Sequence, residues 1–276
     1  MRQPCRIVAE YFFIAGCLFV MLSDERYEAA ELSDEARIVP LGDGALVVEC
    51  GDAITLDSHK RVRQLSNYLE SHPFAGMTEC VPAFTTVTIY YDAMTLMAEH
   101  ADSVAPEDRD FPFAIAVSIV GRMVRQLKDR PVKPAKVVDI PVCYGEDLGP
   151  DLDVVAAHNG LSTEEVIDIH TAADYLVYML GFAPGFAYLG GMSARIAAPR
   201  RQTPRLAIPA GTVGIAGEQT GVYPIVTPGG WQLIGRTPTR LFIPEQMPPT
   251  LLKAGDIVRF YRISRGDYDR WEEPKR

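Results

Sequence analysis

The first half of the chain alternates between strand-like and helix-like patterns of hydrophobic and polar positions. Residues 37–51, RIVPLGDGALVVECG, predict two strands joined by a Gly-Asp-Gly turn. After the turn, residues 45, 47 and 49 would lie on one face of a strand and residues 46, 48 and 50 on the other. Residues 56–72 place apolar side chains three and four positions apart, which is typical of an amphipathic helix, and residues 113–127 predict another. The β-branched and aromatic run at residues 85–91 predicts a strand. Together these elements predict a small α/β sandwich over residues 36–130.

The second half has a different pattern. A strand is predicted at residues 136–144, followed by two helices, the second of which is capped by Ser162 because Glu165 completes a capping box. Residues 181–240 then contain 11 of the 22 glycines and 7 of the 21 prolines, a density that helices do not tolerate. Short strands separated by Gly and Pro turns predict a compact β-barrel over residues 131–270. The predicted strands are residues 213–216, 223–226 and 232–234.

Two segments lie outside these domains. Residues 129–135 contain two prolines and are the predicted linker. Residues 1–35 are predicted to be a disordered extension or to result from an upstream start codon, with Met21 as the true first residue. The apolar run at residues 11–22 is too short to span a bilayer, and the acidic stretch after it has no signal-peptide cleavage site.

Composition excludes several classes of protein. The chain has 276 residues, of which 47% are hydrophobic, so it is neither disordered nor a disulfide-stapled miniprotein. Its formal net charge of -9 argues against nucleic acid as a partner, and nothing indicates a membrane protein. The five cysteines are far apart without zinc-site spacing, so we expect no metal site and a reducing compartment, the cytoplasm.

The positive charge is concentrated in the predicted barrel. Residues 181–240 contain six arginines and a single acid, Glu218. Either the first half of the chain supplies carboxylates that pair with these arginines, or the arginines face an anion, whose carboxylate or phosphate group a guanidinium binds through two hydrogen bonds. The arginines are Arg195, Arg200, Arg201, Arg205, Arg236 and Arg240.

Other candidate residues are less specific. The glycine clusters permit either tight turns or close approach of the backbone to a ligand, and no P-loop or dinucleotide-binding motif is present. His170 lies at the margin of the apolar stripe of its helix, where a histidine is either a buried helix-end residue or a catalyst. Signatures of serine hydrolases and zinc hydrolases are missing from the sequence.

Three glycine-rich runs carry a resemblance to a known family. Residues 170–191, 199–224 and 227–242, with weaker matches over residues 36–263, resemble the allophanate hydrolase subunit 1 family. That family includes the B subunit of bacterial ATP-dependent 5-oxoprolinase and Kip-type inhibitors of histidine kinases, and similar sequences form a carboxyltransferase domain in urea carboxylases. The resemblance implies an α+β fold, in which an N-terminal α/β sandwich is followed by a cyclophilin-like β-barrel.

The resemblance also implies a function and partners. We expect one component of a 5-oxoprolinase, which uses ATP, with or without Mg, to open the lactam of 5-oxo-L-proline to L-glutamate. The implied partners are the homologous subunit 2 or C subunit and an A-type subunit, and the chain is expected to be inactive alone. The alternatives are a histidine-kinase inhibitor and a carboxyltransferase or allophanate-hydrolase component of urea metabolism.

The site hypotheses follow from the expected small anionic substrate. Arg205 and His170 are the predicted catalytic residues, with His170 acting as an acid/base or as an orienting group. Trp231 is expected to be a core or interface residue. The predicted substrate- or anion-binding residues are Arg200, Arg236, Gln219, Thr220, Gly229 and Gly230.

Overall fold

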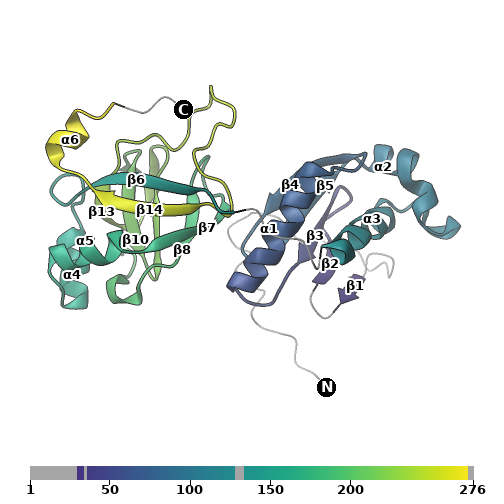
Figure 1. The fold of residues 1–276 in the computed structure, drawn as a ribbon, viewed down its shortest axis with the longest axis horizontal. Coiled ribbons are helices and arrows are strands. Elements are labelled where there is room, and N and C mark those ends of the chain that lie inside the picture. Colours follow the sequence, from purple (N-terminus) through teal and green to yellow (C-terminus); the bar gives the residue numbers. More distant parts are fainter. Residues whose placement is uncertain (1–29, 34–35, 128–133, 273–276) are drawn as a thin grey trace, which may run out of the picture.

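A computed structural model of the chain describes residues 30–33, 36–127 and 134–272. Two bodies follow one another along the chain, a sheet covered by helices and a closed barrel (Figure 1). The predicted α+β class and the sandwich-then-barrel order are therefore confirmed. Most of the predicted linker and of the predicted extension lies outside the described residues, so the domain boundaries stay predictions.

The N-terminal body is a five-stranded antiparallel sheet of order β1-β2-β3-β5-β4. Its strands are β1 (Ala30–Ser33), β2 (Ala36–Pro40), β3 (Ala45–Glu49), β4 (Met77–Pro82) and β5 (Thr86–Tyr91). Its helices are α1 (Leu56–Ser71), α2 (Ala93–His100) and α3 (Pro112–Gln126), with short turns η3 (Ala101–Ser103) and η4 (Pro106–Asp108). Strand β1 adds to the sheet four residues that were expected to belong to the extension, and its backbone pairs antiparallel with that of β2.

Alternation along the strands separates the two faces of this sheet. Leu46 and Val48 of β3 pair with Ile89 and Val87 of β5, and all four side chains are buried. They pack with Leu65 of α1 and the apolar side of α3 in one cluster, so the helices cover a single face. The result is the two-layer sandwich that the sequence predicts.

The C-terminal body is a closed seven-stranded barrel of order β10-β11-β8-β7-β14-β6-β13. Its strands are β6 (Val137–Tyr144), β7 (Asp174–Leu180), β8 (Ala187–Gly190), β10 (Thr212–Ala216), β11 (Gln219–Val222), β13 (Gln232–Arg236) and β14 (Ile257–Arg262). A separate two-stranded ribbon pairs β9 (Arg205–Ile208) with β12 (Thr227–Gly229). The helices are α4 (Leu152–Asn159), α5 (Thr163–Thr171) and α6 (Arg265–Asp269), with the turn η5 (Ala194–Ile196).

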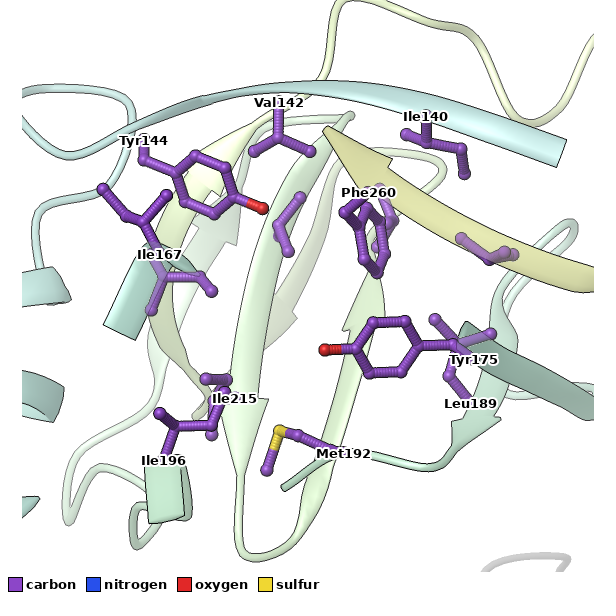
Figure 2. Close-up of a cluster of buried hydrophobic side chains, with 14 of the residues drawn as sticks. Ile140, Val142, Tyr144, Ile167, Tyr175, Leu189, Met192, Ile196, Ile215 and Phe260 are labelled. Carbon is purple, nitrogen blue, oxygen red and sulfur yellow. The ribbon is translucent and has the colours of Figure 1, made fainter. Parts of the chain in front are cut away.

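The barrel is closed by its first and last strands, β6 and β14, which pair in parallel from Val137 opposite Ile257 to Val142 opposite Arg262. Figure 2 shows the side chains that fill the interior, where Tyr144, Tyr175 and Phe260 point toward one another from three strands. The interior is a packed core of large side chains.

Two local predictions have different outcomes. The capping box is confirmed, because Ser162 accepts from the Glu165 amide while the Glu165 carboxylate accepts from the Ser162 amide. The strand predicted at residues 223–226 is wrong. The strand in this region is β11, which ends at Val222, and Pro224 has no amide hydrogen with which to extend it.

Helix α1 joins the sandwich to the barrel at a contact that we call the joint, formed by His59, Arg63, Phe84, Tyr178 and Gly255. The rings of His59 and Tyr178 meet edge to face with centroids 5.0 Å apart, and Phe84 lies 5.5 Å from Tyr178. The Arg63 side chain crosses Gly255 so closely that a Cβ atom there would overlap its Nε atom. A side chain at position 255 would therefore require the end of the Arg63 side chain to move. None of the helices in the described part of the chain combines the length and hydropathy that a membrane span requires.

Candidate anion-binding site on the barrel

Two of the predicted arginines converge on one buried carboxylate, Asp151, whose exposed fraction is 3%. Arg205 binds it through both terminal nitrogens, with distances of 2.8 Å from Nη1 to Oδ2 and 2.9 Å from Nη2 to Oδ1. The Arg201 Nη1 donates to Oδ1 at 3.1 Å, and the Leu233 amide donates to Oδ2 at 2.7 Å. Asp151 thus accepts four hydrogen bonds, and the three charged side chains keep a net charge of +1.

Several elements bring these side chains together. Asp151 directly precedes α4, and its own amide donates to the Leu233 carbonyl of β13 at 2.8 Å. Arg205 begins β9, where it lies opposite Gly229 of β12. The Arg201 amide donates to the Gly230 carbonyl at 2.7 Å. The carboxylate therefore links α4, a barrel strand and the β9–β12 ribbon.

An aromatic cluster lies next to the arginines. Phe186, Ile208, Ala216, Tyr223, Trp231 and Leu233 form a small buried cluster that is separate from the main barrel core. Burial raises the pKa of Tyr223 to about 12, against the opposing effect of the positive charges of Arg200 and Arg205. Arg200 itself is exposed. The site therefore places cationic side chains beside a buried apolar cluster.

The other predicted anion-binding arginine lies at the end of β13. Arg236 is half-buried, and its Nε donates to the Ala210 carbonyl at 2.8 Å. The structure thus brings together Arg201 and Arg205, with Arg200 nearby, and gives Arg236 a separate backbone partner. Arg201 and Arg205 do pair with an acid, but this acid, Asp151, belongs to the barrel half and not to the first half of the chain, from which it was expected.

His170 occupies a different environment, inside the barrel and fully buried. The Thr220 hydroxyl donates to the Gly214 carbonyl, so it accepts from His170 Nε2 at 2.9 Å, and Tyr144 then donates to Nδ1 at 2.8 Å. Burial lowers the pKa of His170 to about 3, so the imidazole is neutral. Its catalytic assignment stays a prediction, and among the two roles considered this position favours orientation over proton transfer.

The remaining predicted residues lie in or beside these packed regions. Thr220 is fully buried against His170, whereas Gln219 begins β11 and is half-buried. A Cβ atom at Gly229 would lie 2.5 Å from the Tyr223 hydroxyl and 2.7 Å from Ile208, so the close approach at this glycine is to side chains of the same chain. Trp231 is 8% exposed and is a core residue, as expected.

Sequence reasoning missed Asp151, the residue on which this site is built. It lies 50 positions before Arg201, outside the glycine-rich segment, and its place before a helix gives it an ordinary capping explanation. The one sequence signal was the unbalanced positive charge, which was consistent either with pairing acids or with a bound anion. No group of three or more His, Cys, Asp or Glu side chains in residues 30–33, 36–127 and 134–272 is arranged to hold a metal ion.

Comparison with known proteins places these features in context. Residues 36–252 match the family model described as carboxyltransferase domain, subdomain C and D. The B subunit of 5-oxoprolinase from Bacillus subtilis is 52% identical over 238 residues, which are 86% of this chain and 97% of that protein. The corresponding B subunit from Escherichia coli O157:H7 is 40% identical over 233 residues, 84% of this chain and 98% of that protein. The crystal structure of TTHA0988 has a TM-score of 0.64 and 34% identity over 80% of this chain, which spans 40% of that longer chain.

Proposed function

Since the chain belongs to the carboxyltransferase domain family, subdomain C and D, we propose that it is the B subunit of an ATP-dependent 5-oxoprolinase, which opens 5-oxo-L-proline to L-glutamate. The observation that carries this proposal is the 52% identity to the B subunit of a 5-oxoprolinase over 97% of that protein's length. Both the sandwich and the barrel are therefore shared with that relative.

The chemistry of the substrate explains why ATP is needed. A lactam carbonyl is a poor electrophile, so its oxygen attacks the γ-phosphorus of ATP and ADP leaves. Water then adds to the activated carbon and the ring C–N bond breaks, which leaves the acyl phosphate of glutamate. A second water displaces inorganic phosphate from it and leaves the free carboxylate. Positive groups that face the substrate carboxylate favour its binding. Positive groups that face the transferring phosphoryl group lower the activation free energy of phosphoryl transfer.

Residues of this chain have distinct roles in the proposal. Arg205 and Arg200 bind the substrate anion beside the aromatic cluster, and Arg236 is a further cationic contact. Gln219, Gly229 and Gly230 shape the surface around the anion. Thr220 is fully buried and acts from beneath it, oriented by its hydrogen bond to His170 inside the barrel. The substrate is a small anion whose carboxylate guanidinium groups bind through paired hydrogen bonds.

Partner subunits complete the enzyme in this proposal. A C subunit homologous to this chain and an A-type subunit assemble with it, and the chain has no 5-oxoprolinase activity by itself. The complex works in the cytoplasm, as the cysteine spacing predicts.

The test is reconstitution with the two partner subunits, followed by measurement of 5-oxoproline-dependent ATP hydrolysis. Arg205→Ala is expected to reduce turnover at least tenfold while the complex still assembles. The matched control is Arg270→Ala, because Arg270 is a highly exposed arginine of the C-terminal region. A reconstituted complex that turns over no 5-oxoproline would refute the proposed function, and full activity of Arg205→Ala would refute the role of Arg205.

A further inference from the structure

We infer that Asp151 is a positioning residue that orients Arg201 and Arg205 to receive the carboxylate of the substrate. The inference rests on the proposed function, because it concerns the substrate of that same site. It adds a residue that the sequence did not indicate and assigns the arginine pair to the carboxylate of 5-oxoproline.

The Asp151 carboxylate lies deeper in the protein than the two guanidinium groups that it binds. Asp151 is almost completely buried, whereas the side chains of Arg201 and Arg205 keep exposed fractions of 35% and 25%. The acid thus holds both arginines from beneath, and the arginines form the layer that solvent reaches. A bound anion would approach from the exposed side.

Arg201 and Arg205 keep hydrogen-bond donors that Asp151 does not use. Arg205 pairs with Asp151 end-on through Nη1 and Nη2, and each of these nitrogens carries a second hydrogen. The Nε atom of Arg201 is buried and has no hydrogen-bond partner within the described residues. Five donors in a fixed fork allow a guanidinium to bind one carboxylate and still offer donors to another.

The net charge of Asp151 and its two arginines favours a monoanion as the ligand. One carboxylate between two guanidinium groups leaves a net charge of +1, which matches a monoanion better than the several charges of a nucleotide triphosphate. The neighbouring cluster of Phe186, Tyr223 and Trp231 is buried, so it supports the arginine pair from within the fold and adds no charge to it. The pair therefore fits a small monocarboxylate.

Asp151 could orient the two arginines for the substrate, or it could only stabilise the fold, and these two roles have different consequences. Asp151 also accepts from the Leu233 amide, so its loss would weaken the fold as well as the site. Asparagine has the same shape and keeps an acceptor for that amide, but it has no charge with which to orient two guanidinium groups. A brace alone would change the melting temperature without changing the affinity for one substrate.

The experiment measures the KM values for 5-oxoproline and for ATP in the reconstituted complex. Asp151→Asn is expected to raise the KM for 5-oxoproline at least tenfold, with kcat within about twofold and the KM for ATP unchanged. Asp151→Glu keeps the charge and is expected to recover part of the affinity. The control is Asp174→Asn, which removes an exposed carboxylate that also pairs with an arginine through two bonds, of 2.6 and 2.9 Å to Arg259.

Different results overturn different statements. A folded, assembled Asp151→Asn complex with an unchanged KM for 5-oxoproline overturns the positioning role, and a raised KM for ATP alone assigns the pair to phosphoryl oxygens and overturns it too. If Asp151→Asn does not fold, Arg201→Met decides, since it keeps the Asp151–Arg205 pair and removes the net charge. It is expected to raise the KM for 5-oxoproline at least tenfold, and an unchanged value overturns the inference. A wild-type complex without turnover instead refutes the proposed function.

Discussion

His170 and His59 are buried as neutral imidazoles, and each has a physical cause for its low basicity. Burial lowers the pKa of His170 to about 3. Burial, and then the charge of Arg63, lower the pKa of His59 to about 4. His170 has both ring nitrogens paired, whereas both of those of His59 lack a hydrogen-bond partner within the described residues. Both imidazoles are therefore neutral, but only that of His170 has its ring nitrogens hydrogen-bonded within the described residues.

Acid should destabilise the fold through His170. In the unfolded chain its pKa returns to about 6.5, so the unfolded state binds the proton first as the pH falls. The contribution of the neutral, buried His170 to the free energy of unfolding is complete above pH 6.5. It is lost progressively as the pH falls from about 6.5 to 3. We expect His170→Gln to be less stable than the wild type at pH 7.5. Its free energy of unfolding should then fall less steeply below pH 6, by about 1 kcal/mol per pH unit.

Urea denaturation at pH 7.5, 6 and 5 measures both effects. Replacing the exposed His158 by Gln is the control, and its pH dependence should equal that of the wild type. Parallel curves for the wild type and His170→Gln would contradict the neutral, buried imidazole.

Residue types could be predicted better than their partners. The arginine excess was visible in the sequence, and so was the choice for His170 between a buried residue and a catalyst. Which acid would face Arg205 was not visible, because Asp151 meets it only after α4, β13 and the ribbon have assembled. Contacts between residues 54 positions apart are set by topology, which local patterns do not encode.

At the scale of elements, the β9–β12 ribbon is held to the barrel both by charge and by packing. Asp151 fixes Arg205 at the start of β9, and Gly229 at the end of β12 lies directly against Tyr223 and Ile208. Long, regular elements such as α1 and α3 could be predicted from periodicity, because many positions carry the same signal. Strands of three to five residues among glycines carry little signal, which is why the strand at β11 was placed four residues too late.

The two neighbouring glycines of this ribbon should respond differently to a methyl group. Gly229→Ala places a Cβ atom 2.5 Å from the Tyr223 hydroxyl, and we expect it to lower the free energy of unfolding by about 1–3 kcal/mol. Gly230→Ala meets no atom closer than 3.7 Å, so its effect should stay within about 0.5 kcal/mol. Thermal or urea unfolding of the purified variants measures the difference. Equal free energies of unfolding for Gly229→Ala and Gly230→Ala would contradict this prediction, because they would show that the ribbon rearranges to accommodate the added methyl group.

At the scale of the whole molecule, the joint decides whether the sandwich and the barrel behave as one unit. Its contacts include an edge-to-face ring pair, His59 with Tyr178, and the passage of Arg63 over Gly255. Asp256, next in the chain, is 2% exposed, and its charge acts on the Arg63 guanidinium. The two-body architecture could be predicted from the change in sequence pattern, but this contact could not, since its residues carry no shared motif.

Gly255→Ala should loosen the joint. The new methyl group would overlap Arg63, and we expect the single thermal transition to separate into two, with a larger radius of gyration by solution scattering. Gly160→Ala is a matched control, because Gly160 also has a positive φ, of 65°, but meets no atom within 4 Å. Both variants should lose about 1 kcal/mol from backbone strain. If Gly160→Ala also separates the transitions, strain rather than the joint is responsible.

The parallel pairing of β6 with β14 has a consequence for biosynthesis. The barrel needs its last strand to close, and β14 emerges from the ribosome after all the other strands of the barrel. At cellular rates of translation, the β6 edge waits on the order of ten seconds for its partner, while the sandwich already has all its strands. During that interval an unpaired strand of mostly buried residues is open to intermolecular pairing. Nascent chains that stall before residue 257 should therefore be the species of this protein that most requires a chaperone.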